Sequence, residues 1–125
     1  MKFGTVFHRV IPNFMVQGGG FTKEGVQKQV NPPIELESTG LKNVAGAIAM
    51  ARTNDPNSAT SQFFINTANN DFLNPSPGNP GYTVFGKVTK GMDVVKSIES
   101  EKTATNSGYS DWPVEEIIIE RAYVK

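Results

Sequence analysis

The stretch that most constrains the fold lies near the start of the chain, where two β-type runs flank a turn signal. The runs are Val6 to Ile11 and Phe14 to Gln17, and Pro12-Asn13 separates them. Aromatic and β-branched residues on both sides of such a dipeptide are typical of a hairpin. The sequence therefore predicts an antiparallel pair of strands before residue 20.

Arg9 is the unusual residue of this hairpin, because a cation there shares a strand with large apolar side chains. Strand residues alternate in direction, so the two expected faces are Phe7, Arg9, Ile11 on one side and Val6, His8, Val10 on the other. An unpaired buried charge is costly. Arg9 is therefore either a surface residue whose stem covers apolar neighbours or a cation held ready for a ligand. His8, on the opposite face, is expected to be a packing residue.

Three glycines, Gly18 to Gly20, follow Gln17 directly. They allow a positive φ or a close approach by another group, and we interpret them as a bend. A phosphate-binding loop is poorly supported, because neither a Gly-Lys-Ser/Thr ending nor the dinucleotide-binding glycine spacing follows.

Composition narrows the function classes. The 125 residues are 38% hydrophobic, which suits one compact domain over residues 1–125. Twelve basic residues balance twelve acidic ones, so net charge does not favour nucleic acid or a membrane surface as a partner. The absence of cysteine excludes thiol chemistry, and the single histidine excludes a histidine-based metal cluster. We expect neither a metal nor a cofactor.

Several further runs read as short strands. Small apolar residues from Val44 to Ala51 suit a buried strand, although periodicity alone leaves a helix open. Ser61 to Asn66 alternates, which places Gln62 and Phe64 on one face. Another strand is expected from Thr83 to Val88.

The remaining elements complete a mainly β prediction. A short helix over Gly91 to Ile98 carries an apolar stripe, Met92, Val95 and Ile98, that we expect in the core. Thr103 to Pro113 is expected to be a loop with Trp112 as a packing residue, and Glu115 to Val124 a final strand. Short strands and many turns favour a barrel or sandwich.

Taken together, the motifs give the sequence a resemblance to the cyclophilins, the peptidyl-prolyl cis/trans isomerases. The matching segments occur in the order and spacing of that family, and they run Phe7 to Pro12, Phe14 to Gly20, Ala49 to Ala51, Ser61 to Ile65 and Val84 to Val88. Met50 to Thr53 with Asn57 to Phe64 looks like the prokaryotic branch.

The resemblance implies a closed antiparallel β-barrel with capping helices, and an outer groove that takes an X-Pro segment. It assigns catalysis to Arg9, supported by Gln17. The substrate-binding positions that it implies are Phe14, Met15, Ala51, Arg52, Gln62, Phe64, Phe72, Leu73 and Tyr82. Phe72 stands where cyclosporin-sensitive relatives carry tryptophan, so only weak cyclosporin binding is expected.

The implied partners are proline-containing peptides and unfolded or folding proteins, bound in the cytoplasm by a protein that is monomeric at full length. Relatives carry two strands and a helix before the segment matching Val6 to Pro12. The resemblance therefore implies a natural start upstream of Met1, where a signal for the periplasm or for secretion could also lie. A chain without those elements is expected to be poorly stable. The competing hypothesis is a non-catalytic proline-peptide-binding module or an inactive fragment.

Overall fold

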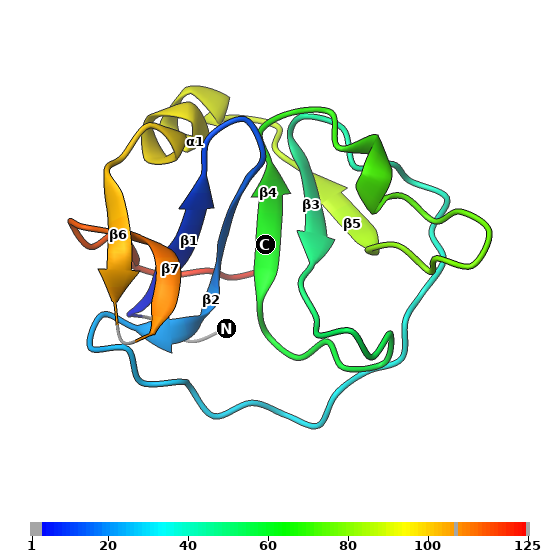
Figure 1. Cartoon of the computed structure of the whole chain (residues 1–125), viewed down its shortest axis with the longest axis horizontal. Helices are drawn as coiled ribbons and strands as arrows, with labels where there is room; N and C mark the ends of the chain where they lie inside the picture. Colours follow the sequence, from blue (N-terminus) through cyan, green and yellow to red (C-terminus); the bar gives the residue numbers. More distant parts are fainter. Residues whose placement is uncertain (1–3, 107, 125) are drawn as a thin grey trace.

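The structure, a computed structural model, describes residues 4–106 and 108–124 and is mainly β, as the sequence predicts (Figure 1). Its elements in chain order are β1 (Thr5–Ile11), β2 (Met15–Thr22), β3 (Ala47–Met50), β4 (Phe63–Asn66), the 3-10 helix η1 (Asp71–Leu73), β5 (Val84–Lys87), α1 (Met92–Glu99), β6 (Thr103–Asn106), β7 (Tyr109–Pro113) and β8 (Ile118–Ile119). That residues 1–125 form a single domain stays a prediction.

Six strands form one antiparallel sheet in the order β5-β3-β4-β2-β1-β8. The hairpin predicted at Pro12-Asn13 is confirmed as β1 and β2, and the run around Ala47 is a strand rather than a helix. Strands β6 and β7 form a separate hairpin, and β7 lies against β1.

Side-chain alternation divides the core between the two faces of the sheet. Phe64 packs with Met15 in one cluster of buried residues, whereas the next residue, Ile65, packs with Val16 in another. The apolar stripe of α1, formed by Met92, Val95 and Ile98, covers this second cluster, as its three-residue spacing predicts. The helix therefore braces the hairpin from the side opposite to the Met15 cluster.

One face assignment in β1 is wrong. Register shifts on either side of Phe7 interrupt the pairing with β2, and such irregularities break strict alternation. Phe7 consequently packs against the second cluster, which contains Val10 as well as Val16 and Ile65. Its ring meets that of Phe63 edge to face at a centroid distance of 6.1 Å. Ile11 packs against the Met15 cluster instead, so Phe7 and Ile11 lie on different faces.

The triple glycine is not a bend, because β2 continues through it to Thr22. Gly19 has a φ of +91°, and a Cβ built there would stand 2.7 Å from the carbonyl oxygen of Ser61. The hydroxyl of Ser61 donates a 2.8 Å hydrogen bond to the carbonyl of Gly19. The absence of a side chain at Gly19 therefore lets the segment that leads into β4 approach β2 closely.

Two expectations for the last quarter of the chain also fail. Residues 103–106 and 109–113 form the β6–β7 hairpin rather than a loop, and exposed polar residues such as Thr105, Asn106 and Ser110 hide the alternation. Glu115 to Val124 contains only the two residues of β8, because the described pairing with β1 joins β8 to Thr5 and Val6 alone. Trp112 is buried against Val6 and Phe21, as expected.

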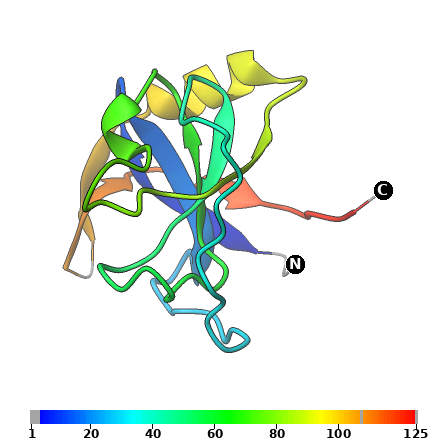
Figure 2. The same cartoon turned by 90° about the vertical axis from the view of Figure 1, so that its right-hand side faces the viewer.

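The long connection between β2 and β3, residues 23–46, runs the length of the sheet, and α1 lies across one end (Figure 2). The connection is fastened near β5 by side-chain hydroxyls. Thr83 donates to the carbonyl of Glu37, and Thr39 donates to the carbonyl of Val84, both at 2.8 Å. Within the connection, Ile34 pairs with Ala59 in a single antiparallel bridge.

Candidate functional site

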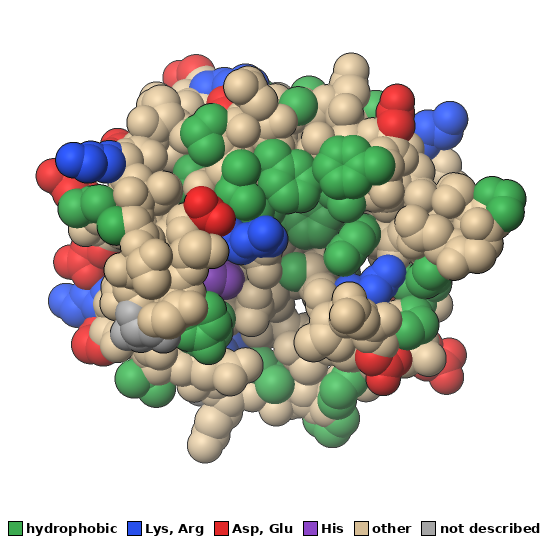
Figure 3. Space-filling view, viewed as in Figure 1, with side chains coloured by type: hydrophobic (Ala, Val, Ile, Leu, Met, Phe, Trp, Pro, Cys, Tyr) green, Lys and Arg blue, Asp and Glu red, His purple; other side chains and the backbone are tan. Residues whose placement is uncertain are grey.

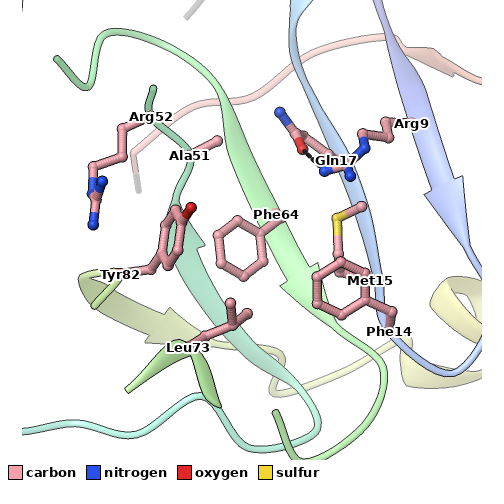
Figure 4. Close-up of a pocket in the computed structure, with 9 residues that line it drawn as sticks. All are labelled: Arg9, Phe14, Met15, Gln17, Ala51, Arg52, Phe64, Leu73 and Tyr82. Carbon is pink, nitrogen blue, oxygen red and sulfur yellow. Dashed lines mark hydrogen bonds between the residues drawn. The ribbon is translucent and has the colours of Figure 1, made fainter. Parts of the chain in front are cut away.

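A hollow of about 130 Å³ opens on the face of the molecule seen in Figure 1. Figure 3 shows hydrophobic side chains gathered in it, with a basic side chain on either side. The residues that line it come from β1, β2, β4, η1 and the segments flanking β3 and β5, and they are Arg9, Phe14, Met15, Gln17, Ala51, Arg52, Phe64, Leu73 and Tyr82 (Figure 4). Nine of the eleven catalytic and substrate-binding residues that the resemblance implies therefore lie around one cavity.

The apolar interior of the hollow is part of the protein core. Met15, Phe64 and Leu73 are 2%, 4% and 8% exposed and belong to one buried cluster. Their neighbours on the partner strands fix them, because Gln17 of β2 pairs with Phe64 of β4. Close-packed interiors deform little, so the interior of the hollow is held in one shape.

Figure 4 shows two walls on either side of Phe64. The first, formed by Phe14 and Met15 at the start of β2, is called here the β2 wall. The second, formed by Leu73 and Tyr82, is called the loop wall. Tyr82 meets Phe64 edge to face at a centroid distance of 5.8 Å. The space between the two walls is apolar and open at one side.

Arg9 lies at the edge of this space, on the side of the β2 wall (Figure 4). Its Nη1 donates to Oε1 of Gln17 at 3.4 Å, and Nε2 of Gln17 donates to Oε1 of Gln62 at 2.8 Å. Arg9 is exposed, and among the described residues no carboxylate lies within ion-pair distance of it. The guanidinium therefore has donor groups available for a ligand in the hollow.

Gly20 makes room for Gln62 in this arrangement. A Cβ built on Gly20 would stand 2.5 Å from Nε2 of Gln62 and 2.6 Å from its Cδ. A larger residue at position 20 would push the Gln62 side chain away from Gln17. One of the three glycines thus leaves room for the Gln62 amide, which orients Gln17 and, through Gln17, Arg9.

Arg52 forms the far rim, beside the loop wall. Its guanidinium carbon lies 4.4 Å from the ring centroid of Tyr82, and it donates hydrogen bonds to the carbonyls of Thr53 and Gly81. Stacking of a guanidinium on an aromatic face is attractive and holds both groups. Arg52 therefore orders Tyr82, whereas Arg9 faces the hollow with fewer contacts.

Two nominated residues lie beside the cavity rather than in its lining. Phe72 is 67% exposed and stacks on Phe14 at a centroid distance of 5.7 Å, so it extends the β2 wall outward. Gln62 lies behind Gln17 and reaches the hollow only through it. The roles of all eleven residues in binding or catalysis stay predictions.

His8 is a buried packing residue, as its face predicts. Its ring lies 4.7 Å from that of Phe21 and 5.7 Å from that of Trp112, measured between centroids. Burial, and secondarily the positive charge of Arg9, lowers the pKa of the His8 imidazole to about 4. The ring is therefore neutral at neutral pH and adds no charge beside Arg9.

Sequence reasoning missed Glu99, which supports the β1–β2 turn from α1. Its Oε2 accepts a 2.7 Å hydrogen bond from the amide of Asn13, which has a φ of +59°. Burial alone would raise the pKa of Glu99, but the Thr67 hydroxyl, the Asn13 amide and the Lys96 ammonium favour the carboxylate and lower it overall. The sequence does offer one signal for Glu99, which is a carboxylate in the last turn of a helix. The helix dipole disfavours negative charge there, so such a residue needs another reason for its position.

Within residues 4–106 and 108–124 there is no group of three or more His, Cys, Asp or Glu residues that could hold a metal ion. In the same residues no helix is long and apolar enough to cross a membrane.

Comparison with known proteins identifies similar chains. Residues 2–124 match the family described as "Cyclophilin type peptidyl-prolyl cis-trans isomerase/CLD". The chain is 52% identical over 125 residues to a peptidyl-prolyl cis-trans isomerase, cyp18, of Streptomyces antibioticus, covering 97% of this chain and 75% of the relative. It is 53% identical over 123 residues to a peptidyl-prolyl cis-trans isomerase of Acinetobacter baylyi, covering 98% of this chain and 65% of that protein.

A further bacterial relative and a solved structure agree. Peptidyl-prolyl cis-trans isomerase B of Escherichia coli is 50% identical over 124 residues, covering 96% of this chain and 76% of the relative. A crystal structure of a Cryptosporidium parvum cyclophilin-type peptidyl-prolyl cis-trans isomerase, obtained in the presence of the dipeptide Ala-Pro, superposes with a TM-score of 0.71 at 29% identity. That likeness covers 94% of this chain and 72% of the other. The chain thus spans between about two thirds and three quarters of these proteins.

Proposed function

Because this chain belongs to the cyclophilin-type peptidyl-prolyl cis-trans isomerases, a family of isomerase enzymes, we propose that it catalyses rotation about X-Pro bonds in peptides and folding proteins. The observation that carries the proposal is the position of Arg9 at the edge of an apolar hollow, with Gln17 behind it. The hollow suits a proline ring, and Arg9 suits the nitrogen of that ring. The Ala-Pro dipeptide present with the Cryptosporidium relative supports the same class of ligand.

The reaction requires no bond to be broken. The C–N bond of an X-Pro peptide has partial double-bond character, which gives rotation a barrier of roughly 20 kcal/mol. As the bond twists, the prolyl nitrogen becomes pyramidal and gains a lone pair that the planar amide does not offer. A donor that meets this lone pair therefore stabilises the twisted state more than either planar state.

Arg9 is the donor in this mechanism. Its guanidinium stays charged at any accessible pH and carries several N–H groups in a fixed plane. Gln17 limits the orientations of that plane, because its Oε1 accepts from Nη1. A donor oriented before the reaction needs little reorganisation as charge develops on the nitrogen.

The two walls hold the ring while the preceding residue rotates. Phe14 and Met15 on one side, and Leu73 and Tyr82 on the other, contact a ring placed over Phe64. Fixing the ring against a core-packed surface confines the twist to the C–N bond. Neither a general base nor a nucleophile takes part.

Exchange spectroscopy on a short Ala-Pro peptide tests the proposal. The native chain should accelerate cis-to-trans exchange, and Arg9→Ala should lower kcat/KM by on the order of a hundredfold, the usual effect of losing one transition-state donor. Arg9→Lys, which keeps the charge but loses the planar fork, should recover only part of the rate. Equal exchange rates with the native chain and Arg9→Ala would disprove catalysis by Arg9. Peptide binding without any acceleration would instead identify a binding module.

A further inference from the structure

Three buried asparagines lie behind the hollow, at the end of the sheet where the β1–β2 turn, the end of β4 and the start of β3 meet (Figure 1). Asn43 and Asn66 are completely buried, and Asn70 is 4% exposed. Asparagine is seldom buried to this extent, because its amide must find hydrogen-bond partners away from water. These three residues, called here the asparagine relay, find their partners in one another and in the backbone.

The relay is a chain of hydrogen bonds with one direction. Nδ2 of Asn70 donates to Oδ1 of Asn66 at 2.7 Å, and Nδ2 of Asn66 donates to Oδ1 of Asn43 at 3.0 Å. The second hydrogen on Nδ2 of Asn66 is directed to the carbonyl of Ala47 at 3.1 Å. Every polar atom of the Asn66 amide is therefore satisfied, and reversing the amide would place donors against donors.

The ends of the relay reach the two walls of the hollow. At one end, Nδ2 of Asn70 donates to the carbonyl of Phe14, in the β2 wall, at 2.9 Å. At the other end, Nδ2 of Asn43 lies 3.3 Å from the carbonyls of Leu73 and Tyr82, in the loop wall, and shares its two hydrogens between them and Oδ1 of Asn74 at 3.1 Å. Phe14 and Leu73 are 59 residues apart in the sequence, yet the three side-chain amides of the relay connect their backbones.

We infer that the asparagine relay is a positioning device that sets the spacing of the β2 wall and the loop wall, and through it the affinity for a proline ring. The inference rests on the proposed function, since it assigns the ring to the space between the walls. Apolar contacts favour burial but are non-directional, so they allow a range of wall spacings. Hydrogen bonds weaken steeply with length and angle, so a closed chain of them selects one spacing.

The relay acts on binding rather than on the rotating bond. Arg9 is oriented by Gln17 and Gln62, and neither glutamine bonds to a relay residue. A loosened relay therefore weakens contact with the ring in the planar and twisted states alike. Loss of such uniform binding raises KM and leaves kcat nearly unchanged.

Asn70→Ala provides the test, because Asn70 is the least enclosed member and its loss leaves the carbonyl of Phe14 with the amide of Thr67 as a donor. The Kd and the exchange rate of an Ala-Pro peptide are measured together by NMR titration and exchange spectroscopy. Both hydrogen bonds of the Asn70 amide are lost, and we expect the Kd to rise between about threefold and tenfold as the wall spacing loosens, with the rate at saturation close to native.

Asn69→Ala is the matched control. Asn69 is an exposed neighbour whose Oδ1 accepts from the amide of Ala45 at 2.9 Å and which has no bond to the relay. Its replacement also removes an asparagine and a hydrogen bond near the same turn. The control should leave the peptide Kd at the native value.

The outcomes separate clearly. A native Kd with a lowered saturating rate would place the effect on the rotating bond rather than on binding, and it would overturn the inference, as would equal Kd values for all three chains. Should Asn70→Ala not fold, Asn70→Ser keeps a hydroxyl donor and should show a smaller rise in Kd, whose absence would count equally against the relay. A native chain that binds no proline peptide would overturn the proposed function itself and is recognised before any variant is made.

Discussion

Nε2 of Gln17 donates a 2.8 Å hydrogen bond to Oε1 of Gln62, which turns the carbonyl oxygen of Gln17 toward Arg9. A primary amide cannot present its oxygen to both partners at once. The bond to Gln62 therefore decides which group the guanidinium meets. Orientation of the proposed catalytic cation thus depends on a residue that lies outside the cavity lining.

Replacing Gln62 with leucine should reduce catalysis while Arg9 remains in place. Without the acceptor on Gln62 the Gln17 amide is free to turn, and the donor orientation of Arg9 is lost for part of the time. We expect a roughly fivefold to tenfold fall in kcat/KM, as for the loss of one hydrogen bond. Gln17→Leu should cost more, because it removes the direct contact. A Gln62→Leu variant as impaired as Arg9→Ala would show that Gln62 has a larger role than orientation.

Gly20→Ala should displace the Gln62 amide, and with it the Gln17 amide, by steric overlap. The added Cβ overlaps the Gln62 side chain, which must move away from Gln17. We expect kcat/KM to fall several-fold, as one hydrogen bond is lost, with a change in the free energy of unfolding of only about 1 kcal/mol. Gly86→Ala is the control, since a Cβ there meets nothing within 4 Å and the residue does not have a positive φ. Similar activities for the two variants would refute the steric argument.

The free energy of unfolding should fall as the pH is lowered from 6.5 to about 4, because His8 is buried as a neutral ring. Its folded pKa, about 4, lies below the ordinary value of 6.5, so the unfolded chain binds the proton more readily. This group costs no stability above pH 6.5, and its destabilising effect grows as pH falls to about 4, reaching about 3 kcal/mol. Denaturant melts between pH 7 and pH 4 measure the slope. His8→Phe, which keeps an aromatic ring beside Phe21 and Trp112, should flatten it.

Glu99 should contribute a separate, more acidic transition. Its folded pKa is lowered, so its stabilising effect is present above pH 4.5 and disappears as pH falls below that value. Glu99→Ala should destabilise the protein by about 2 kcal/mol at pH 7, because the Asn13 amide loses its charged hydrogen-bond acceptor. Glu101→Ala, at an exposed position two residues on, should have little effect. Equal melting curves for these two variants would argue against support of the turn by α1.

Most of the site residues follow from the resemblance to the cyclophilins rather than from strand periodicity. Alternation by itself places Gln62 on the same face as Phe64, and the turn signal places Phe14, Met15 and Gln17 at the start of the second strand of the hairpin. Alternation gives the wrong face for Phe7, because the irregular register on either side of it cannot be predicted from residue types. Local pattern thus gives side-chain direction only where pairing is regular.

Long-range polar contacts account for most of what sequence reasoning missed. Asn43, Asn66 and Asn70 resemble the many turn-forming asparagines of this chain, and only the folded backbone brings their amides together. Glu99 was overlooked for a similar reason, since its partner Asn13 lies 86 residues away. The polar strands β6 and β7 lack the apolar alternation that would have distinguished them from loop.

The interior of the hollow is shared with the hydrophobic core, which limits how such a protein can change its preferences during evolution. Substituting Met15, Phe64 or Leu73 alters ligand contact and core packing together, so each change in selectivity there carries a cost in stability. Phe72, whose side chain is mostly in solvent, and the exposed part of the rim carry no such penalty. Divergence among relatives with different clients should therefore accumulate around the mouth of the groove, while its depths stay the same.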